Sequence, residues 1–258
     1  MFRHAIVRPP GKNFADGLTT VDLGVPSFEN ALDQHESYCR ALEECGLALT
    51  RLPSDLRYPD STFVEDTAIL TRRGAILTRP GAASRLGEVA AIETALAPFF
   101  PEGRLGRIVA PGTLDGGDIC EAGDHFFIGV SRRTNPEGAR QLAGILAGAG
   151  FTTSCIDIRE IDSILHLKSG IAWLDGRRLA AIGALAGHKA LADWEILRVD
   201  PGEDYAANCV RVNDTVLVAA GFPRLESAIR RLGHRVVPLE MSEFRKMDGG
   251  LSCLSLRW

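Results

Sequence analysis

The chain carries a repeated pattern of short apolar runs, turn residues and helical stretches. In "FVEDTAILTRRGAILTRPG" two apolar runs lie on either side of Arg73-Gly74, and the helical "SRLGEVAAIETALAPFF" and the apolar "GRIVAP" follow them. Apolar, β-branched runs bounded by turn residues predict strands, and apolar positions three and four residues apart predict a helix. We therefore interpret this segment as one ββαβ unit.

Three more copies of this unit follow along the chain. The second turns at Gly123-Asp124, and its helix has Asn135 as the candidate N-cap, Pro136 at its first position and Gly150 beyond its end. The third has the hairpin signal Asp175-Gly176, a short helical "HKALADW" and the strand "EILRVD". The fourth consists of "NCVRVNDTVLVAAG", "RLESAIRRLG" and "HRVVPLE". The recurrence predicts a fold built from repeated small sheets.

The two ends of the chain supply the parts of a fifth copy. The N-terminal part contains the strand "HAIVRP", the helical "PSFENALDQHESYCRALEECG" and the strand "LALTRLP", and the C-terminal part ends in the strand-like "CLSLRW". These pieces complete a unit only if the last strand pairs with the first, which would pin both termini. The predicted fold class is α/β, a five-bladed α/β-propeller of five ββαβ units whose terminal strands close the ring, formed by a single domain of residues 1–258. An open α/β sheet with hairpin insertions is the alternative.

The composition is that of an ordinary globular protein, and it excludes several classes of function. The 258 residues are 45% hydrophobic, the formal net charge is −4, and lysines and arginines are dispersed among acidic residues, so a nucleic-acid partner is not expected. No apolar run has the length of a membrane span and the N-terminus lacks a signal peptide's apolar region, so we expect a cytoplasmic protein. The cysteines lack CxxC or CxxH spacing, which predicts neither a zinc site nor a disulfide framework. They are Cys39, Cys45, Cys120, Cys155, Cys209 and Cys253.

Polar residues gather where the first strand of each unit begins. If the units form a ring, these ends lie around one axis and their side chains face one another. Carboxylates, an imidazole and a thiol would then share one pocket, and buried anions need a cationic partner. A guanidinium, with its planar fork of N–H donors, suits several carboxylates better than a simple ammonium. The residues concerned are Glu65 and Asp66, Asp115 and Asp118, His166, Asn208, and Asp248, Ser252 and Cys253.

A thiol and an imidazole beside a bound guanidinium have a defined chemistry. A Cys253 thiolate could attack the guanidinium carbon, a His166 imidazolium could protonate the departing amine, and the neutral imidazole could then activate water. Neighbouring carboxylates raise the pKa of a thiol, whereas a bound cation lowers it, so the thiolate should form mainly when substrate is present. The residue pattern therefore predicts covalent catalysis on a guanidine compound.

Each of these residues also has a purely structural interpretation. A strand cysteine is most often a packed, inert thiol, and His166, between two leucines, could be a satisfied core histidine. "LDGGD" could simply form a turn, Glu65-Asp66 could be an exposed acidic pair, and "SRRTN" could be a solvated charge run before a helix. Only the convergence of these residues favours a catalytic site, to which Arg85, Arg132 and Arg133 could add cations for a substrate carboxylate.

Seven motifs in order along the chain resemble those of one enzyme family. They are "FVEDTAIL", "TRPGAASR", "LDGGD", "SRRTN", "LHLKSG", "YAANC" and "MDGGLSCLS". Together they are similar to motifs of the dimethylarginine dimethylaminohydrolases, a branch of the guanidine-modifying (pentein) superfamily that includes arginine deiminases and amidinotransferases. The resemblance spans essentially the whole chain, and it implies the five-bladed α/β-propeller with an active site on its axis.

The resemblance also implies roles for individual residues. Cys253 in "LSC" matches the family nucleophile, His166 matches the general acid and base, and Asp115 matches the acid that orients the histidine, a position at which some relatives carry Glu. Met247 stands where relatives have an aliphatic residue. The matches to substrate-binding positions are the acids Asp60, Glu65 and Asp66, the arginines Arg85 and Arg133 at the amino acid end, Leu18 in the lid, and Met247 and Asp248 beside the nucleophile.

The reaction that the resemblance implies is hydrolysis of Nω-methylated L-arginine to L-citrulline and dimethylamine or methylamine, through a covalent thiouronium and with no metal or organic cofactor. Two other functions stay open, namely the same chemistry on free arginine, agmatine or another guanidine, and a non-enzymatic binding module as in the ribosome anti-association factors of this fold. The chain lacks the helical insertion of arginine deiminases, which favours the dimethylarginine branch. The expected partner is the small guanidine substrate, without nucleic acid or membrane, and an exposed blade edge is compatible with a homodimer.

Overall fold

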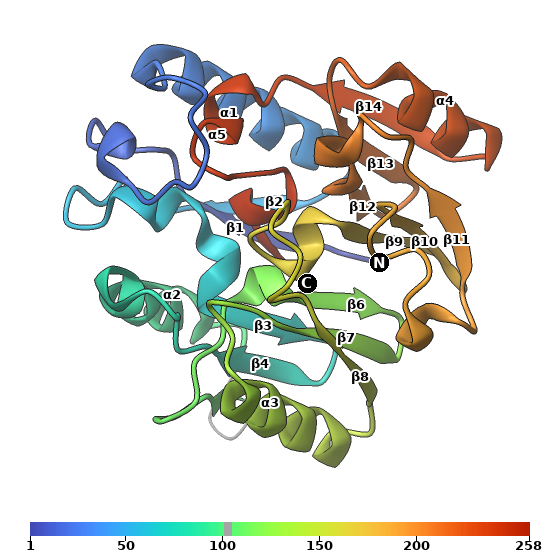
Figure 1. Ribbon diagram of the computed structural model, residues 1–258. Coiled ribbons are helices and arrows are strands. Elements are labelled where there is room, and N and C mark those ends of the chain that lie inside the picture. The colour runs from blue at the N-terminus through green and yellow to red at the C-terminus, as the bar shows by residue number, and fades with distance from the viewer. Residues whose placement is uncertain (101–104) are drawn as a thin grey trace. The chain divides into compact units, whose positions relative to one another are not determined.

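The computed structural model describes residues 1–100 and 105–258, and within these ranges the chain forms five three-stranded sheets joined by short helices (Figure 1). In each sheet the middle strand pairs antiparallel with one neighbour and parallel with the other. This pairing confirms the strands of the predicted ββαβ repeat. The sheets are β15 (Leu256–Arg257), β1 (His4–Val7) and β2 (Ala48–Arg51); β3 (Ala68–Thr71), β4 (Gly74–Leu77) and β5 (Leu105–Arg107); β6 (Ile119–Ala122), β7 (His125–Val130) and β8 (Thr152–Asp157); β9 (Ile171–Asp175), β10 (Arg178–Ala181) and β11 (Glu195–Arg198); and β12 (Val210–Val212), β13 (Thr215–Ala219) and β14 (Arg235–Leu239).

The strands differ in burial according to their place in the sheet. The middle strands β1, β4, β7, β10 and β13 are almost entirely buried, whereas the outer strands β2, β8 and β11 expose many of their side chains. A strand buried on both faces is expected to be a continuous apolar run, and "TVLVA" and "HFFIGV" have that composition. The apolar runs of the sequence therefore mark the inner part of each unit.

Helices connect the second and third strands of four units, and α3 (Pro136–Gly148) begins as predicted. The side chain of Asn135 accepts a hydrogen bond from the Gly138 N–H, and Gly150, beyond the helix, has a φ of +78°. The predicted helix "HKALADW" is wrong, because only the 3-10 turn Lys189–Leu191 forms there. Helices this short depend on tertiary packing, and Leu191 is the one buried residue of this segment. The other helices are α1 (Phe28–Glu44), α2 (Val89–Leu96), α4 (Pro223–Arg231) and α5 (Ser242–Arg245).

Two groups of residues each form a compact unit. We call residues 1–65 together with 209–258 the terminal unit, and residues 66–208 the central unit. The terminal unit holds the sheets β15-β1-β2 and β12-β13-β14, and the central unit holds the other three. A single domain of residues 1–258 stays a prediction.

The terminal unit joins the two ends of the chain in one sheet. β15 pairs antiparallel with β1, so that Ala5 lies opposite Arg257, and β1 pairs parallel with β2. The carbonyl of Trp258 accepts hydrogen bonds from the N–H groups of Arg3 and His4, and the rings of His4 and Trp258 stack with centroids 5.4 Å apart. The prediction that the last strand pairs with the first is therefore confirmed.

The central unit is built around helix α3 and the sheet β6-β7-β8. The apolar residues of α3 recur three and four positions apart, which gives the helix one apolar face. That face packs against aromatic and aliphatic side chains of β7 and of the start of β8, in a cluster that also takes in β4 and β6. The buried cluster consists of Ile69, Ile76, Ile108, Leu114, Ile119, Phe126, Ile128, Ala139, Leu142, Leu146 and Phe151.

A short 3-10 turn precedes the first strand of every unit. The turns are 64–67 before β3, 116–118 before β6, 167–169 before β9, 204–207 before β12 and 252–254 before β15. The sequence had suggested that "FVEDTAIL" and "CLSLRW" are strands throughout, but β3 begins only at Ala68 and β15 only at Leu256. Glycines before the cysteine and adjacent carboxylates that each need polar partners favour a turn over a regular strand. The turns carry most of the polar residues that the sequence singled out.

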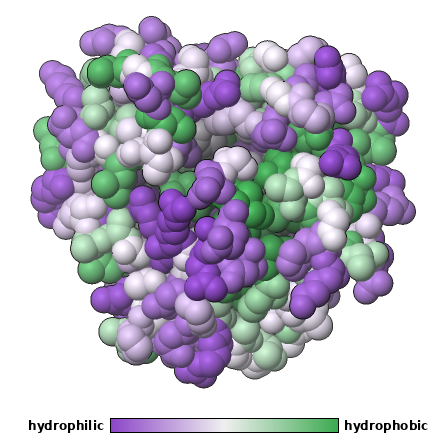
Figure 2. Space-filling view, in the orientation of Figure 1, coloured by the Kyte–Doolittle hydropathy of each residue, from purple (hydrophilic) through white to green (hydrophobic). Residues whose placement is uncertain are grey.

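The surface is mixed in character. On the face shown in Figure 2, hydrophilic residues are interspersed with hydrophobic ones, as is normal for the exterior of a folded domain. Among the helices in residues 1–100 and 105–258, none is both long enough and apolar enough for a bilayer crossing.

Candidate active site

The residues that the sequence assigns to the site fall into two groups. Five of these residues lie in or directly beside the 3-10 turns before the first strands, namely Glu65, Asp66, Asp115, His166 and Cys253. The central unit holds Asp66, Arg85, Asp115, Arg133 and His166, and the terminal unit holds Leu18, Asp60, Glu65, Met247, Asp248 and Cys253.

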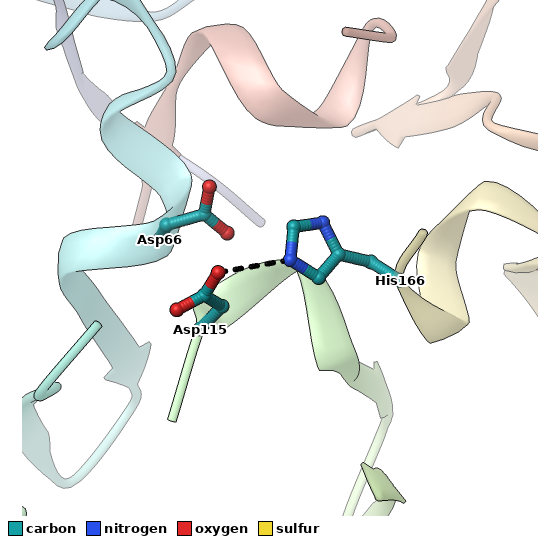
Figure 3. Close-up of side chains that lie close together, drawn as sticks. All are labelled: Asp66, Asp115 and His166. Carbon is teal, nitrogen blue, oxygen red and sulfur yellow. Dashed lines mark hydrogen bonds and ion pairs between the residues drawn. The ribbon is translucent and has the colours of Figure 1, made fainter. Parts of the chain in front are cut away.

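In the central unit, Asp115 and His166 form a buried hydrogen-bonded pair. The Nε2 of His166 lies 3.0 Å from the Oδ2 of Asp115, and both residues are buried, Asp115 completely (Figure 3). The other oxygen of Asp115 accepts a hydrogen bond from the Gly81 N–H, and its own N–H donates to the Oγ1 of Thr134. Because Asp115 is fixed from several sides, it can hold the imidazole in one orientation, which is what a general acid and base requires.

The charges around His166 favour its protonated form. Burial alone would lower the pKa of His166, but the carboxylates of Asp66, Asp118 and Asp115 outweigh it and raise the pKa to about 9. At neutral pH the ring is therefore an imidazolium whose Nε2–H donates a hydrogen bond to Asp115. An imidazolium in this position can donate a proton to a leaving group.

Asp66 is anchored on the other side of this cluster. Its Oδ1 accepts a hydrogen bond from the Gly117 N–H at 2.9 Å, and its Oδ2 pairs with the Nη1 of Arg85 at 2.5 Å. Burial would raise the pKa of Asp66, but His166 and Arg85 lower it to about 2. Asp66 is thus an anion at every physiological pH.

Arg85 is held by two carboxylates. Its Nε and Nη2 donate to the carboxylate of Glu88 at 2.8–3.2 Å, and its Nη1 donates to Asp66. All three side chains are at most 5% exposed. A guanidinium with two carboxylates in hydrogen-bond contact is a rigid element of the site, and its assignment to the substrate's amino acid end stays a prediction.

Asp118, three residues after Asp115, supports the segment that carries His166. The hydroxyls of Ser131 and Thr134 each donate to its Oδ2 at 2.6 Å, and the Leu167 N–H donates to its Oδ1 at 3.0 Å. The last bond ties Asp118 to the residue that follows His166. Burial raises the pKa of Asp118 to about 6, against the lowering effect of His166 and the hydroxyl groups.

Gly117 is required by the close approach of the imidazole. A Cβ on Gly117 would lie 2.7 Å from the Nδ1 of His166 and 3.1 Å from the Oδ1 of Asp66, so that no side chain fits between them. The "LDGGD" motif is therefore a turn, as its composition indicates, and also the wall against which the histidine lies.

Arg133 is more accessible than Arg85, the other arginine that the sequence assigns to the substrate's amino acid end. Its Nη1 lies 3.8 Å from the Oδ2 of Asp115, and its side chain is 17% exposed. Its backbone N–H donates to the Ser131 hydroxyl, which belongs to the support of Asp118. A partly exposed guanidinium beside the histidine pair can receive an external carboxylate.

The central group also has the donor geometry of a cation site. The ligand atoms of Asp66, Asp115 and His166 all lie within 4.8 Å of one another. In the described structure, Arg85 and the imidazolium of His166 supply positive charge to these carboxylates. These carboxylates therefore suit a cationic organic group that binds without displacing Arg85 or the imidazolium of His166.

In the terminal unit, Glu65 and Cys253 are linked through Ser252. The Ser252 hydroxyl donates to the Oε2 of Glu65 at 2.7 Å, and Cys253 follows in the same 3-10 turn, with its N–H donating to the carbonyl of Gly250. Cys253 is partly exposed and, like the other five cysteines, retains its thiol. The turn therefore carries the thiol on the residue that follows Ser252, the serine bonded to the buried carboxylate.

The segment around Leu18, the predicted lid residue, contacts Asp60 and the residues that precede Cys253. The Leu18 N–H donates to the Oδ1 of Asp60 at 3.0 Å, and Leu18 itself is 41% exposed. The N–H and the hydroxyl of Thr20 both donate to the Oδ2 of Asp248, at 2.5 and 2.9 Å. Met247, buried, lies close to Gly17. In the terminal unit the structure thus brings together Leu18, Asp60, Met247 and Asp248.

Several supporting residues escaped the sequence analysis. Glu88 stands three positions after Arg85, a spacing at which helical side chains meet, so this partner could have been found. Thr20 and Arg257 gave no local signal, because their partners Asp248 and Glu65 lie about two hundred residues away in the sequence. Such partners emerge only from the tertiary structure.

Comparison with known proteins identifies the family. No model of a protein family matches the chain. The N(G),N(G)-dimethylarginine dimethylaminohydrolase of Pseudomonas aeruginosa is 48% identical over 258 residues, with 100% of both chains covered. The enzyme of that name from Streptomyces coelicolor is 35% identical, covering 99% of this chain and 96% of its own.

Solved structures agree with the sequence comparison. The Pseudomonas aeruginosa dimethylarginine dimethylaminohydrolase in complex with citrulline matches with a TM-score of 0.96 and 47% identity over 100% of both chains. The N-terminal domain of a cyanobacterial arginine dihydrolase matches with a TM-score of 0.86 at 17% identity over 98% of this chain and 96% of its own, which shows the fold alone. The predicted fold class, the five-bladed α/β-propeller, is thus confirmed, and the chain belongs to the dimethylarginine dimethylaminohydrolase family.

Proposed function

We propose that the protein hydrolyses Nω-methylated L-arginine to L-citrulline and dimethylamine or methylamine, with Cys253 as nucleophile, His166 as general acid and base, and Asp115 as the residue that orients the histidine. The observation that carries the chemistry is the buried His166–Asp115 pair, whose imidazole has a pKa raised to about 9. The choice of substrate rests on the relatives, which are named for dimethylarginine.

The first half of the reaction forms a bond to sulfur. The thiolate of Cys253 attacks the guanidinium carbon, and the resulting tetrahedral adduct expels the methylated nitrogen as its C–N bond breaks. The imidazolium of His166 gives that nitrogen the proton it needs to leave as a neutral amine. The product of this half is an S-alkylthiouronium on Cys253 and a neutral His166.

The second half releases citrulline. The neutral imidazole of His166 takes a proton from water, the hydroxide adds to the thiouronium carbon, and the C–S bond breaks to return the thiolate of Cys253. The carbon keeps one oxygen, the remaining proton of that oxygen passes to solvent, and the carbon becomes the ureido group of citrulline, while His166 is again an imidazolium. Water and a methylated guanidinium are thus converted to citrulline and an ammonium ion, because the neutral amine takes up a proton from solvent after it leaves.

Bound substrate would also lower the pKa of His166, the general acid. Asp66 is one of the carboxylates that raise the pKa of His166. Asp60, Glu65 and Asp66 are the three acids proposed to contact the substrate guanidinium. A guanidinium bound at Asp66 would compensate the negative charge of that carboxylate. The pKa of His166 would then fall from about 9 toward neutrality, where a group transfers protons in both directions most effectively.

The other proposed contacts concern the amino acid end of the substrate. Arg133, partly exposed beside Asp115, is better supported for the carboxylate than Arg85, which Glu88 and Asp66 already engage. Leu18, Met247 and Asp248 would cover the substrate, since Leu18 and Thr20 are hydrogen-bonded to Asp60 and Asp248. A cytoplasmic location, a homodimer and a single catalytic domain of residues 1–258 are part of the same proposal.

The experiment compares substrates in one assay. Citrulline release is measured from asymmetric dimethylarginine, monomethylarginine, arginine and agmatine, with Cys253→Ser as the control for the thiol. We expect release from the two methylated arginines and none from the control variant. Much faster release from arginine or agmatine would identify a deiminase, and release from none of the four would favour a binding protein of this fold.

A further inference from the structure

Two residues without a role in the proposed chemistry hold the buried carboxylate of Glu65. Glu65 is 4% exposed and Ser252 3% exposed, and the Ser252 hydroxyl donates to Oε2 of Glu65 at 2.7 Å. On the other side, Nη2 of Arg257 lies 4.0 Å from Oε1 of Glu65. We propose that Ser252 and Arg257 are positioning residues that orient the Glu65 carboxylate for the substrate guanidinium, an inference that rests on the proposed function.

Arg257 can do this because three oxygen atoms hold Nη1, the guanidinium nitrogen that does not face Glu65 in the ion pair. Its Nη1 donates to the hydroxyl of Ser255 at 2.5 Å, to the carbonyl of Ser255 at 3.2 Å and to the hydroxyl of Tyr38 at 3.4 Å. The two hydroxyls are themselves 2.6 Å apart, and Tyr38 is completely buried in α1. A guanidinium is planar, so fixing Nη1 also fixes the direction of Nη2.

The cation reaches Glu65 because the chain ends are paired. Arg257 lies in β15, opposite Ala5 of β1, and Trp258 after it is hydrogen-bonded to Arg3 and His4. The closing strand therefore carries a positive charge to a buried anion, which offsets part of the cost of burying that anion. The ion pair with Glu65 thus adds to the strand pairing and hydrogen bonds that hold Arg257 and Trp258 in place.

Ser252 connects the same carboxylate to the nucleophile's turn. Ser252, Cys253 and Leu254 form one 3-10 turn, so the hydrogen bond from Ser252 sets the position of Glu65 relative to that turn. A carboxylate can accept several hydrogen bonds at once, so the bond from Ser252 is compatible with contact between Glu65 and the N–H groups of a guanidinium. Preorganised acceptors of this kind contribute most when they need no rearrangement on binding.

A purely structural role would look different in a double mutant. If Ser252 acts through Glu65, its removal should cost little once the carboxylate is already replaced by an amide. If Ser252 serves only to hold the turn, the two losses should multiply. The variants are Ser252→Ala, Glu65→Gln and the two combined, with Ser37→Ala as matched control, because the Ser37 hydroxyl donates to a carbonyl within α1.

We expect Ser252→Ala to lower kcat/KM for asymmetric dimethylarginine about 10- to 100-fold, the range for losing one hydrogen bond to a charged group. In the Glu65→Gln background the same change should lower it less than about 3-fold, and Ser37→Ala should leave it unchanged. A Ser252→Ala variant with wild-type kcat/KM, or losses that multiply in the double mutant, would overturn the role of Ser252.

Arg257 is tested by a pair of substitutions that differ in charge. Arg257→Lys keeps a cation in β15 and Arg257→Gln removes it, and circular dichroism during heating shows whether each variant still folds cooperatively. We expect Arg257→Gln to lose at least about 5-fold more kcat/KM than Arg257→Lys. Equal losses would reduce Arg257 to a structural residue. Failure of the wild type to release citrulline would instead refute the proposed function itself, so the two failures are distinguishable.

Discussion

Each unit of the protein contains one deeply buried histidine, and the two histidines have opposite properties. His35 in α1 of the terminal unit is 3% exposed, and His166 of the central unit is 7% exposed. Burial lowers the pKa of His35 to about 4, with Arg51 adding to the effect, whereas three carboxylates raise the pKa of His166 to about 9. Equal burial therefore does not determine whether a histidine is charged.

The neighbours of the two rings explain the difference. The Nδ1 of His35 lies 3.6 Å from the sulfur of Cys39, one helical turn further along, and the thiol has a pKa raised by burial to about 12. That pair is neutral at physiological pH, so His35 has the character of a core histidine, the structural interpretation that the sequence left open for His166. His166 lies among fixed anions, and the contrast shows that the arrangement of charge, rather than the residue type, marks the site.

The largest expected effect separates the two histidines by function. His166→Ala should lower kcat about 10²- to 10⁴-fold, the usual contribution of a general acid and base, with a much smaller change in substrate affinity. His35→Leu should keep kcat within about 2-fold. Steady-state citrulline release and thermal melting of both variants check this, and a His166→Ala variant with intact kcat but weakened affinity would reverse the assignment.

The second prediction compares two ion pairs, one in each unit. Glu88→Gln removes one partner of the buried Arg85 and should lower the free energy of unfolding by about 3–5 kcal/mol. Glu36→Gln removes a partner of the exposed Arg51, whose pair is over 40% exposed on both sides, and should lower it by less than about 1 kcal/mol. Urea unfolding measures both, and similar losses would contradict the contrast between the two units.

The third prediction concerns stability and pH. The pKa of His35 is about 4 in the folded protein and 6.5 in the unfolded chain. Its contribution to the free energy of unfolding is therefore present above pH 6.5 and is lost as the pH falls toward 4. The loss amounts to about 3 kcal/mol, at about 1.36 kcal/mol for each pH unit. His166 acts in the opposite direction, because its raised pKa gives stability below pH 6.5 that is lost as the pH rises through about 9.

Unfolding experiments across this pH range can separate the two contributions. His35→Leu should flatten the acid side of the profile and leave the alkaline side unchanged, whereas His166→Ala should do the reverse. A profile of His35→Leu that still falls by the full wild-type amount between pH 6.5 and 4 would show that other groups govern acid unfolding.

The smallest expected effect concerns the segment 17–20. Asp248 has a φ of +56°, a left-handed conformation that Asn adopts readily, so Asp248→Asn should keep the backbone and lose only charge. With the bonds from Thr20 weakened, KM should rise about 2- to 10-fold while kcat stays close to the wild type, and Thr20→Val should act in the same direction. A fall in kcat alone would place Asp248 in the chemistry instead.

The sequence predicted the sheets and their hairpins better than the geometry of the site. Repeated apolar runs and turn residues were sufficient for the sheets and for the closing pair β15 and β1, since these follow from local periodicity and from the need to complete a repeat. Cys253 was placed on a strand but lies in a 3-10 turn, because the glycines before it act on the backbone more strongly than the apolar residues after it. Motif resemblance nominated His166 and Asp115, and their hydrogen bond agrees with that pairing.

The sequence could not predict which residues pair with the charged side chains of the site and shift their pKa values. Arg85 was expected to hold the substrate's amino acid end. The spacing of three residues indicates its partner Glu88, but its bond to Asp66 depends on how two separate 3-10 turns meet in space. The raised pKa of His166 likewise depends on three carboxylates from two separate segments of the chain, Asp66 in one and Asp115 and Asp118 in the other. These sums of distance-dependent interactions have no signature in residue spacing.

The side-by-side pairing of β1 and β15 makes the protein a candidate for circular permutation. A short peptide linker could join Trp258 to Met1, and new ends could be opened at the exposed Gly123-Asp124 hairpin, where the strand ladder would stay intact. In such a permutant the cysteine-bearing turn would lie in the interior of the polypeptide rather than close to its last residue.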